Sequence, residues 1–189
     1  IVNTMGVSVS AAFAVVNRID DFAYTPEQNI AHAMTALMAQ NKGAGKIDRM
    51  KEGFRCGIIL ETIYGILIFI ICFALARPLM MMFVKDEEVI GHGVTYLHLI
   101  SVMYLLPALT NGIQGFFRGI GDLKITLISS FINMALRVLA AAPLVFIWKM
   151  GIEALPYSYL AGWIGMLVAE TPLLLKTYKT WGKKGETPC

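Results

Sequence analysis

Long apolar segments separated by short polar connections dominate the chain. Four of them lie at 56–76, 93–117, 125–148 and 154–175, and none contains more than one Asp, Glu, Lys or Arg. About 20 apolar residues in a helix are enough to cross the hydrocarbon core of a bilayer. The pattern therefore predicts four membrane-spanning helices, with a longer polar link at 77–92 between the first two.

A fifth and less apolar helix is predicted over 9–41. Its polar side chains recur at steps of three and four residues, which places them in one stripe on a helix: Asn17, Asp20 or Asp21, Tyr24, Glu27 or Gln28, and Thr35. In a membrane such a stripe needs protein or water beside it. Residues 1–6 are expected to end a preceding helix at a glycine–serine turn over 6–8, which would make this sequence a fragment.

The composition indicates a membrane protein, because 57% of the residues are hydrophobic and 15% are charged, whereas soluble domains carry about 25% charged residues. The net charge of +3 comes from basic residues in short loops, so nucleic acid is not expected as a partner. The sequence lacks an HExxH pattern and a nucleophile–base pair at helical spacing, and its three cysteines lack metal-binding spacing. We therefore expect neither an enzyme nor a bound metal or cofactor.

The basic residues are distributed unevenly between the two sides of the predicted helices. Eleven of the 16 fall on one side and three on the other, and loops rich in Lys and Arg face the cytoplasm. We therefore predict a multi-pass protein of the cytoplasmic (inner) membrane, with segments 42–55, 118–124 and 176–189 on the cytoplasmic side. The predicted fold is an all-α membrane helix bundle with about five complete transmembrane helices and the end of a sixth.

Four short motifs follow one another along the chain. The first is Ala-Ala-Phe-Ala-Val-Val-Asn-Arg-Ile at 11–19 with a proline downstream, and the second is Gln-Asn-x-Gly-Ala-Gly at 40–45 before a basic stretch. The third is Phe-Phe-Arg-Gly-Ile-Gly-Asp at 116–122, and the fourth joins Gly-Ile at 151–152 to Gly-Trp at 162–163. Together they resemble the carboxyl-terminal half of multidrug and toxic compound extrusion (MATE) transporters. The resemblance covers 1–177 as a six-helix bundle with an incomplete first helix, and leaves 178–189 as a basic tail.

This resemblance implies a function and a set of partners. Transporters of this family are antiporters of twelve helices, in which two six-helix bundles enclose a central cavity and expel small organic cations in exchange for protons or sodium ions. The implied partners are the lipid bilayer, an amino-terminal half of the same transporter and the organic cations. Sodium-coupled members carry an acidic residue in the tenth helix, whereas this chain has none between Glu88 and Asp122. A sodium site of that type is therefore not expected here.

Three acidic residues are the candidates for cation coupling: Asp20, Asp21 and Glu27. An aspartate at the centre of a bilayer costs about 2.5–3.5 kcal/mol, so these side chains must face protein or water. Arg18 would pair with Asp21 on the same helical face. Glu27 follows Pro26, whose missing amide is expected to kink the helix. The alternative is that the aspartates only pair with charges near the outer end of the helix.

Further polar residues are candidates for lining the cavity, and interhelical hydrogen bonding is the alternative for most of them: Asn17, Arg18, Tyr24, Gln28, Asn111, Gln114 and Arg137. Arg137 lies mid-span and would serve as a structural clamp if it does not line the cavity. Two other functions stay open. A lipid-linked oligosaccharide flippase of the same broad fold would need a more cationic cavity, and a fragment alone could be a structural membrane segment that transports nothing.

Overall fold

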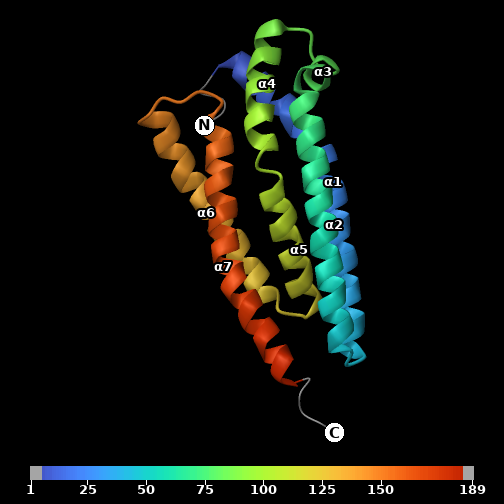
Figure 1. Ribbon diagram of the computed structural model, residues 1–189. Helices are drawn as coiled ribbons and strands as arrows, with labels where there is room; N and C mark the ends of the chain where they lie inside the picture. Colours follow the sequence, from blue (N-terminus) through green and yellow to red (C-terminus); the bar gives the residue numbers. More distant parts are fainter. Residues whose placement is uncertain (1–5, 185–189) are drawn as a thin grey trace.

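A computed structural model of the chain describes the backbone of residues 6–184 and the side chains up to residue 180. This part of the chain forms seven α-helices (Figure 1): α1 (Val7–Gly43), α2 (Ile47–Ala74), α3 (Ala76–Met81), α4 (Glu87–Ser101), α5 (Leu105–Gly119), α6 (Leu123–Phe146) and α7 (Ala154–Lys184). The predictions made for residues 1–5 and 185–189 lie outside the described residues.

The helices form five long rods, namely α1, α2, the α4–α5 pair, α6 and α7 (Figure 1). α2, α6 and α7 are long and apolar enough to cross a membrane, and the α4–α5 pair meets the same test as one bent span. α1 does not pass this test because its polar stripe lowers its hydropathy, although its 37 residues extend over about 55 Å. The predicted all-α membrane bundle is therefore confirmed.

The span predicted at 93–117 is wrong as a single helix. It is broken at 102–104, and the two parts, α4 and α5, are bent by 50° relative to each other. α4 begins before the predicted start because Asp86 caps it, its carboxylate accepting hydrogen bonds from the amides of Glu88 and Val89 at 2.9 and 3.2 Å. Pro107 lies in the first turn of α5, where a missing amide is tolerated. Together with α3, this makes the predicted link at 77–92 largely helical.

Two other predicted boundaries differ from the structure. The expected turn at 6–8 is reduced to Gly6, which has a φ of 109°, and α1 begins at Val7. The last helix was predicted to end at 175, but α7 continues to Lys184 and passes through the expected boundary between 177 and 178. The loop between α1 and α2, the loop between α5 and α6, and the carboxyl end of α7 lie at one end of the bundle (Figure 1). We call this the basic end.

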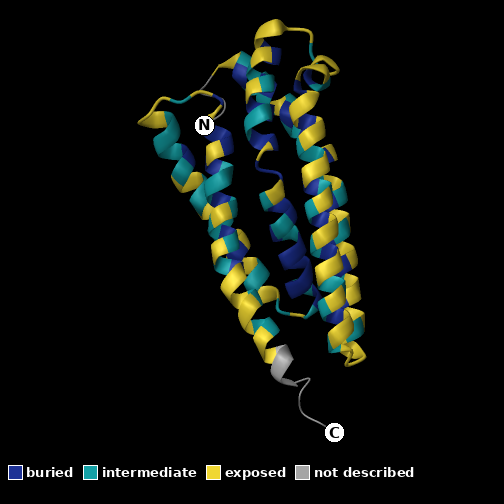
Figure 2. Ribbon diagram, viewed as in Figure 1, coloured by how far each residue is buried: buried dark blue, intermediate teal, exposed yellow. Residues whose placement is uncertain are grey.

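α1 and α5 run parallel, with Ala31 beside Gly115 and Thr35 beside Gly119. The Thr35 hydroxyl donates a hydrogen bond to the Gly115 carbonyl at 3.1 Å, and the backbones touch at two glycines. A Cβ added at Gly115 would lie 2.6 Å from the Ala31 carbonyl oxygen, and one at Gly119 would lie 2.6 Å from that of Thr35. Small residues allow such close packing between membrane helices. α5 therefore lies buried at the centre of the bundle (Figure 2).

Candidate functional site: buried carboxylates around α5

Four acidic side chains are buried among the described residues. Asp20 is 5% exposed, and Glu27, Glu61 and Glu170 are fully buried. They come from α1, α2 and α7, whereas the α4–α5 span contributes none between Glu88 and Asp122. The polar residues of the bent span nevertheless face three of these carboxylates, because α5 lies at the centre of the bundle and the other helices surround it.

Asp20 has a defined hydrogen-bond partner at the break between α4 and α5. The hydroxyl of Tyr104 donates to its Oδ1 atom at 2.5 Å. Tyr104 is fully buried, and the Tyr24 ring packs edge-on against it with 5.5 Å between ring centroids. The helix break thus supplies the hydroxyl that compensates the loss of water around Asp20.

Glu27 and Glu61 form a second buried group, where α1, α2 and α5 meet. The two carboxylates are close enough to repel each other, and the Asn111 side chain faces Glu27. Within the described part of the chain, none of the four carboxylate oxygens has a partner at hydrogen-bond geometry. Gly112 of α5 packs against this part of α2, since a Cβ added there would lie 2.6 Å from Ile58 Cδ1 and 3.5 Å from Glu61 Cγ. Burial without a partner is costly for a polar group and more costly for a charge.

A hydrogen bond from a side chain of α2 to the backbone of α1 joins the helices beside this pair. The Tyr64 hydroxyl of α2 donates to the Ala23 carbonyl of α1 at 3.0 Å, one turn from Glu27. α1 continues as a helix through Pro26, which precedes Glu27 directly and lacks the amide that would bond the Phe22 carbonyl. The pair therefore sits beside an interrupted hydrogen-bond ladder.

Glu170 is the buried carboxylate nearest the basic end. The Gln114 amide of α5 donates to its Oε1 atom through a long hydrogen bond of 3.4 Å, and also to the Ser130 hydroxyl at 3.3 Å. The other carboxylate oxygen has no partner among the described residues, although Arg118 is close enough to interact with it electrostatically. Gln114 thus links α5 to both α6 and α7.

The predicted residues of α1 differ in how far the structure buries them. Asp20 and Glu27 are buried, Asn17 and Tyr24 are partly buried, and Arg18, Asp21 and Gln28 are exposed. Arg18 and Asp21 were expected to pair, but the ion pairs among the described residues join Asp48 to Lys51, Arg77 to Glu87 and Glu88 to His92. The expected pair is therefore not formed.

The other predicted residues lie on α5 and α6. Asn111 faces Glu27, and Gln114 bonds Glu170, as described above. The Arg137 guanidinium carbon lies 3.7 Å from the centroid of the Tyr159 ring, a geometry that stabilises a cation by its interaction with the ring electrons. Arg137 of α6 thus has an aromatic partner on α7.

From the sequence, Glu61 and Glu170 were expected only to add to the acidic charge of a cavity, and Tyr104 was assigned no role. Glu61 had a recognisable signal, because Gly57 and Gly65 flank it at steps of four and leave that face of α2 open to another helix. Tyr104 had none, since it lies in an apolar run. Among residues 6–184, no three His, Cys, Asp or Glu side chains gather as potential metal ligands.

Comparisons with known proteins support the family resemblance. The MatE family model matches residues 1–142. The chain is 30% identical over 190 residues to YoeA of Bacillus subtilis (strain 168), covering 97% of this chain and 39% of that protein. It is 24% identical over 163 residues to NorM of Thermotoga maritima, covering 86% of this chain and 34% of that protein. Both relatives are described as probable multidrug resistance proteins.

A solved structure described as MATE in the bent conformation shares the fold. It aligns with a TM-score of 0.90 at 16% identity, covering 95% of this chain and 40% of that one. The chain thus spans about two-fifths of the length of the proteins that it matches. The match of the family model to most of the sequence confirms the resemblance carried by the four motifs, and the chain belongs to the MATE family of membrane transporters.

Proposed function

We propose that this chain is part of an antiporter that exports small organic cations in exchange for protons or sodium ions, and that Glu27 and Glu61 form its coupling site. The observation that carries the proposal is the pair itself, two fully buried carboxylates with no hydrogen-bond partner for any of their four oxygens among the described residues. The descriptions of YoeA and NorM as multidrug resistance proteins support the class of cargo.

The pair favours binding of a positive charge. Two unit charges 4 Å apart repel by about 4 kcal/mol at an effective dielectric constant of 20, and a membrane interior offers no water to solvate them. A proton or a monovalent cation between Glu27 and Glu61 removes this repulsion. The site can release its ion only when water reaches it, so release is tied to the conformational change that opens the bundle.

The charges in the bundle favour a cationic cargo. The four buried ionisable side chains among the described residues that line helix interfaces are all acidic, and the mid-span Arg137 lies against the Tyr159 ring. An oligosaccharide flippase would need basic groups for a pyrophosphate. We extend the proposal to the arrangement of the whole protein: an amino-terminal half completes the cavity, and the basic end faces the cytoplasm.

The site residues are compatible with either coupling ion. Glu27, Glu61 and the Asn111 amide together offer five oxygen atoms, the type of ligand that hard cations prefer, whereas a proton needs only one carboxylate. Asp20 plays a supporting part, because its charge is already compensated by Tyr104. The exposed Arg18 and Gln28 would line the path of the cargo.

Ethidium efflux from proteoliposomes that contain the intact transporter tests the proposal. Imposed proton and sodium gradients are compared for Glu27→Gln, Glu61→Gln and the matched control Asp21→Asn, which removes an exposed acid from α1. We expect gradient-driven efflux to fall more than tenfold in both glutamine variants and to stay within about twofold of wild type in the control, in line with a lost ion site. Ethidium exchange without a gradient should persist in all three.

Two results would contradict the proposal. If Glu27→Gln and Glu61→Gln keep their response to both gradients, the coupling site lies elsewhere. If Asp21→Asn loses the response and the glutamine variants keep it, the exposed side of α1 carries the coupling. The gradient that drives wild-type efflux identifies the ion.

A further inference from the structure

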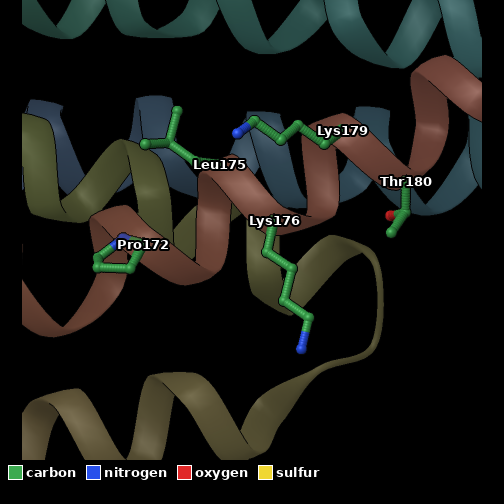
Figure 3. A pocket seen from close by; sticks show the side chains of 5 residues that line it. All are labelled: Pro172, Leu175, Lys176, Lys179 and Thr180. Atoms are coloured by element: carbon green, nitrogen blue, oxygen red, sulfur yellow. The ribbon is translucent and has the colours of Figure 1, made fainter.

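A groove opens between α2 and α7 at the basic end of the bundle. Its volume is about 720 Å³, and it is lined by Lys51, Glu52, Phe54, Arg55, Ile58, Ile59 and Tyr178. A second hollow of about 480 Å³ adjoins the last turns of α7 and is lined by Pro172, Leu175, Lys176, Lys179 and Thr180. Leu175 and Lys179 project from one side of α7 and Lys176 from the opposite side (Figure 3).

Aromatic side chains form the inner wall of the groove. The Tyr178 hydroxyl of α7 donates to the Lys51 carbonyl of α2 at 3.3 Å. The Phe54 ring lies 5.7 Å from the Tyr178 ring and 4.9 Å from the Phe116 ring of α5, measured between centroids. Because three helices contribute to it, this wall is a packed surface that closes the groove toward the core.

The groove changes from charged to aliphatic along its length. On α2, Lys51 and Arg55 lie nearer the basic end than Ile58 and Ile59. α7 ends where α2 begins, so Lys179 of the second hollow also lies near this end, and Leu175 lies one turn farther from it. Basic side chains at an interface with their stems on apolar surface are suited to a charged headgroup above a hydrocarbon chain.

The charge of the lining favours an anion. The groove is lined by two basic residues, Lys51 and Arg55, against a single acid, Glu52. Lys51 also pairs with Asp48, but at 3.8 Å and with a fully exposed Asp48 side chain, and such a pair contributes little to stability. The Lys51 ammonium group is therefore available to a stronger partner.

We propose that this groove binds one anionic phospholipid of the leaflet at the basic end. Its phosphate lies between Lys51 and Arg55, and an acyl chain runs against Ile58 and Ile59 below them. The lipid adds a link between α2 and α7 beside the Tyr178 hydrogen bond. It thereby couples the α6–α7 hairpin to the rest of the bundle in membranes that contain anionic lipid.

Binding of phosphatidylglycerol to the purified protein in phosphatidylcholine nanodiscs tests the proposal. Retained lipid is counted by native mass spectrometry as the phosphatidylglycerol content is raised. The double variant Lys51→Gln/Arg55→Gln removes two charges of the groove, and Lys46→Gln/Arg49→Gln removes two exposed charges of the same loop region outside it. We expect the first to weaken binding of a single lipid more than tenfold and the second less than about twofold, since each basic residue near a headgroup contributes separately.

A third variant, Ile59→Trp, fills the aliphatic part without changing charge, and it should also reduce retention of the lipid. Equal losses in the two charge variants would overturn the proposal in favour of general attraction to the surface. Displacement of the lipid by inorganic phosphate would overturn it in favour of a free-anion site. An Ile59→Cys side chain that resists a lipid-soluble maleimide in the absence of bound lipid would show that a protein segment occupies the groove instead.

Discussion

Asp20 and Glu27 are two acids of the same buried face of α1, and their surroundings differ in kind. They lie seven residues apart, and the residues of α5 and its preceding break that face them, Tyr104 and Asn111, lie seven residues apart as well. Asp20 receives a hydroxyl at 2.5 Å, whereas Glu27 faces another carboxylate and none of its oxygens has a hydrogen-bond partner among the described residues.

Under the proposed function, the comparison separates a structural acid from an exchangeable one. A carboxylate that accepts a short hydrogen bond from a buried hydroxyl has its charge compensated within the protein. A pair of carboxylates without such donors depends on a proton or cation that comes from solution. One register between α1 and α5 therefore places a fixed polar contact two helical turns from a site suited to ion exchange.

The largest effect should come from breaking this register. Gly115→Ala places a methyl group 2.6 Å from the Ala31 carbonyl oxygen, so the backbones of α1 and α5 must separate. We expect a loss of about 3 kcal/mol in the free energy of unfolding, as for severe overpacking. Thermal unfolding in detergent measures it. Gly43→Ala is the matched control, since its Cβ meets nothing within 4 Å, and an equal loss there would contradict the prediction.

A smaller loss should follow when Asp20 is deprived of its partner. Tyr104→Phe removes the hydroxyl and leaves a buried carboxylate oxygen without a donor, which costs about 1–3 kcal/mol of unfolding free energy. Tyr24→Phe removes a buried hydroxyl that has no partner among the described residues, so it should leave stability unchanged or raise it slightly. Equal losses in both variants, measured by thermal unfolding, would show that the Asp20–Tyr104 contact stabilises nothing.

The sequence predicted the crossing segments because each is a continuous apolar run, but hydropathy does not register a bend within such a run. The break at 102–104 was missed for this reason, and with it the position of Tyr104. Ends set by capping were also missed, as at Asp86, since a single carboxylate decides where α4 begins.

For the site, helical periodicity predicted one polar face with Asp20 or Asp21, Tyr24, and Glu27 or Gln28, and the structure places Asp20, Tyr24 and Glu27 on the protein side of α1. Periodicity did not distinguish Asp20 from Asp21. Each residue turns the helix by about 100°, so steps of three and of four residues both return to nearly the same face. The partners of these acids depend on the register between helices, which the pattern of one helix does not contain. Glu61 and Asn111 therefore came together only in the structure.

The smallest effect, and one of opposite sign, should come from relieving the unpartnered pair. Glu61→Gln removes one of two repelling carboxylates and offers an amide donor to Glu27, so we expect the free energy of unfolding to rise by about 1 kcal/mol, the net contribution of one hydrogen bond. Glu52→Gln, at an exposed position of the same helix, should change it by less than about 0.5 kcal/mol. Thermal unfolding in detergent without added sodium measures both.

A destabilised Glu61→Gln would mean that the Glu61 carboxylate stabilises the packing of α2, as the Tyr104 hydroxyl is expected to stabilise Asp20. A stabilised variant that has also lost gradient-driven efflux would show that stability is sacrificed at this pair for ion exchange, a trade expected where a site must remain unsatisfied until its ion arrives.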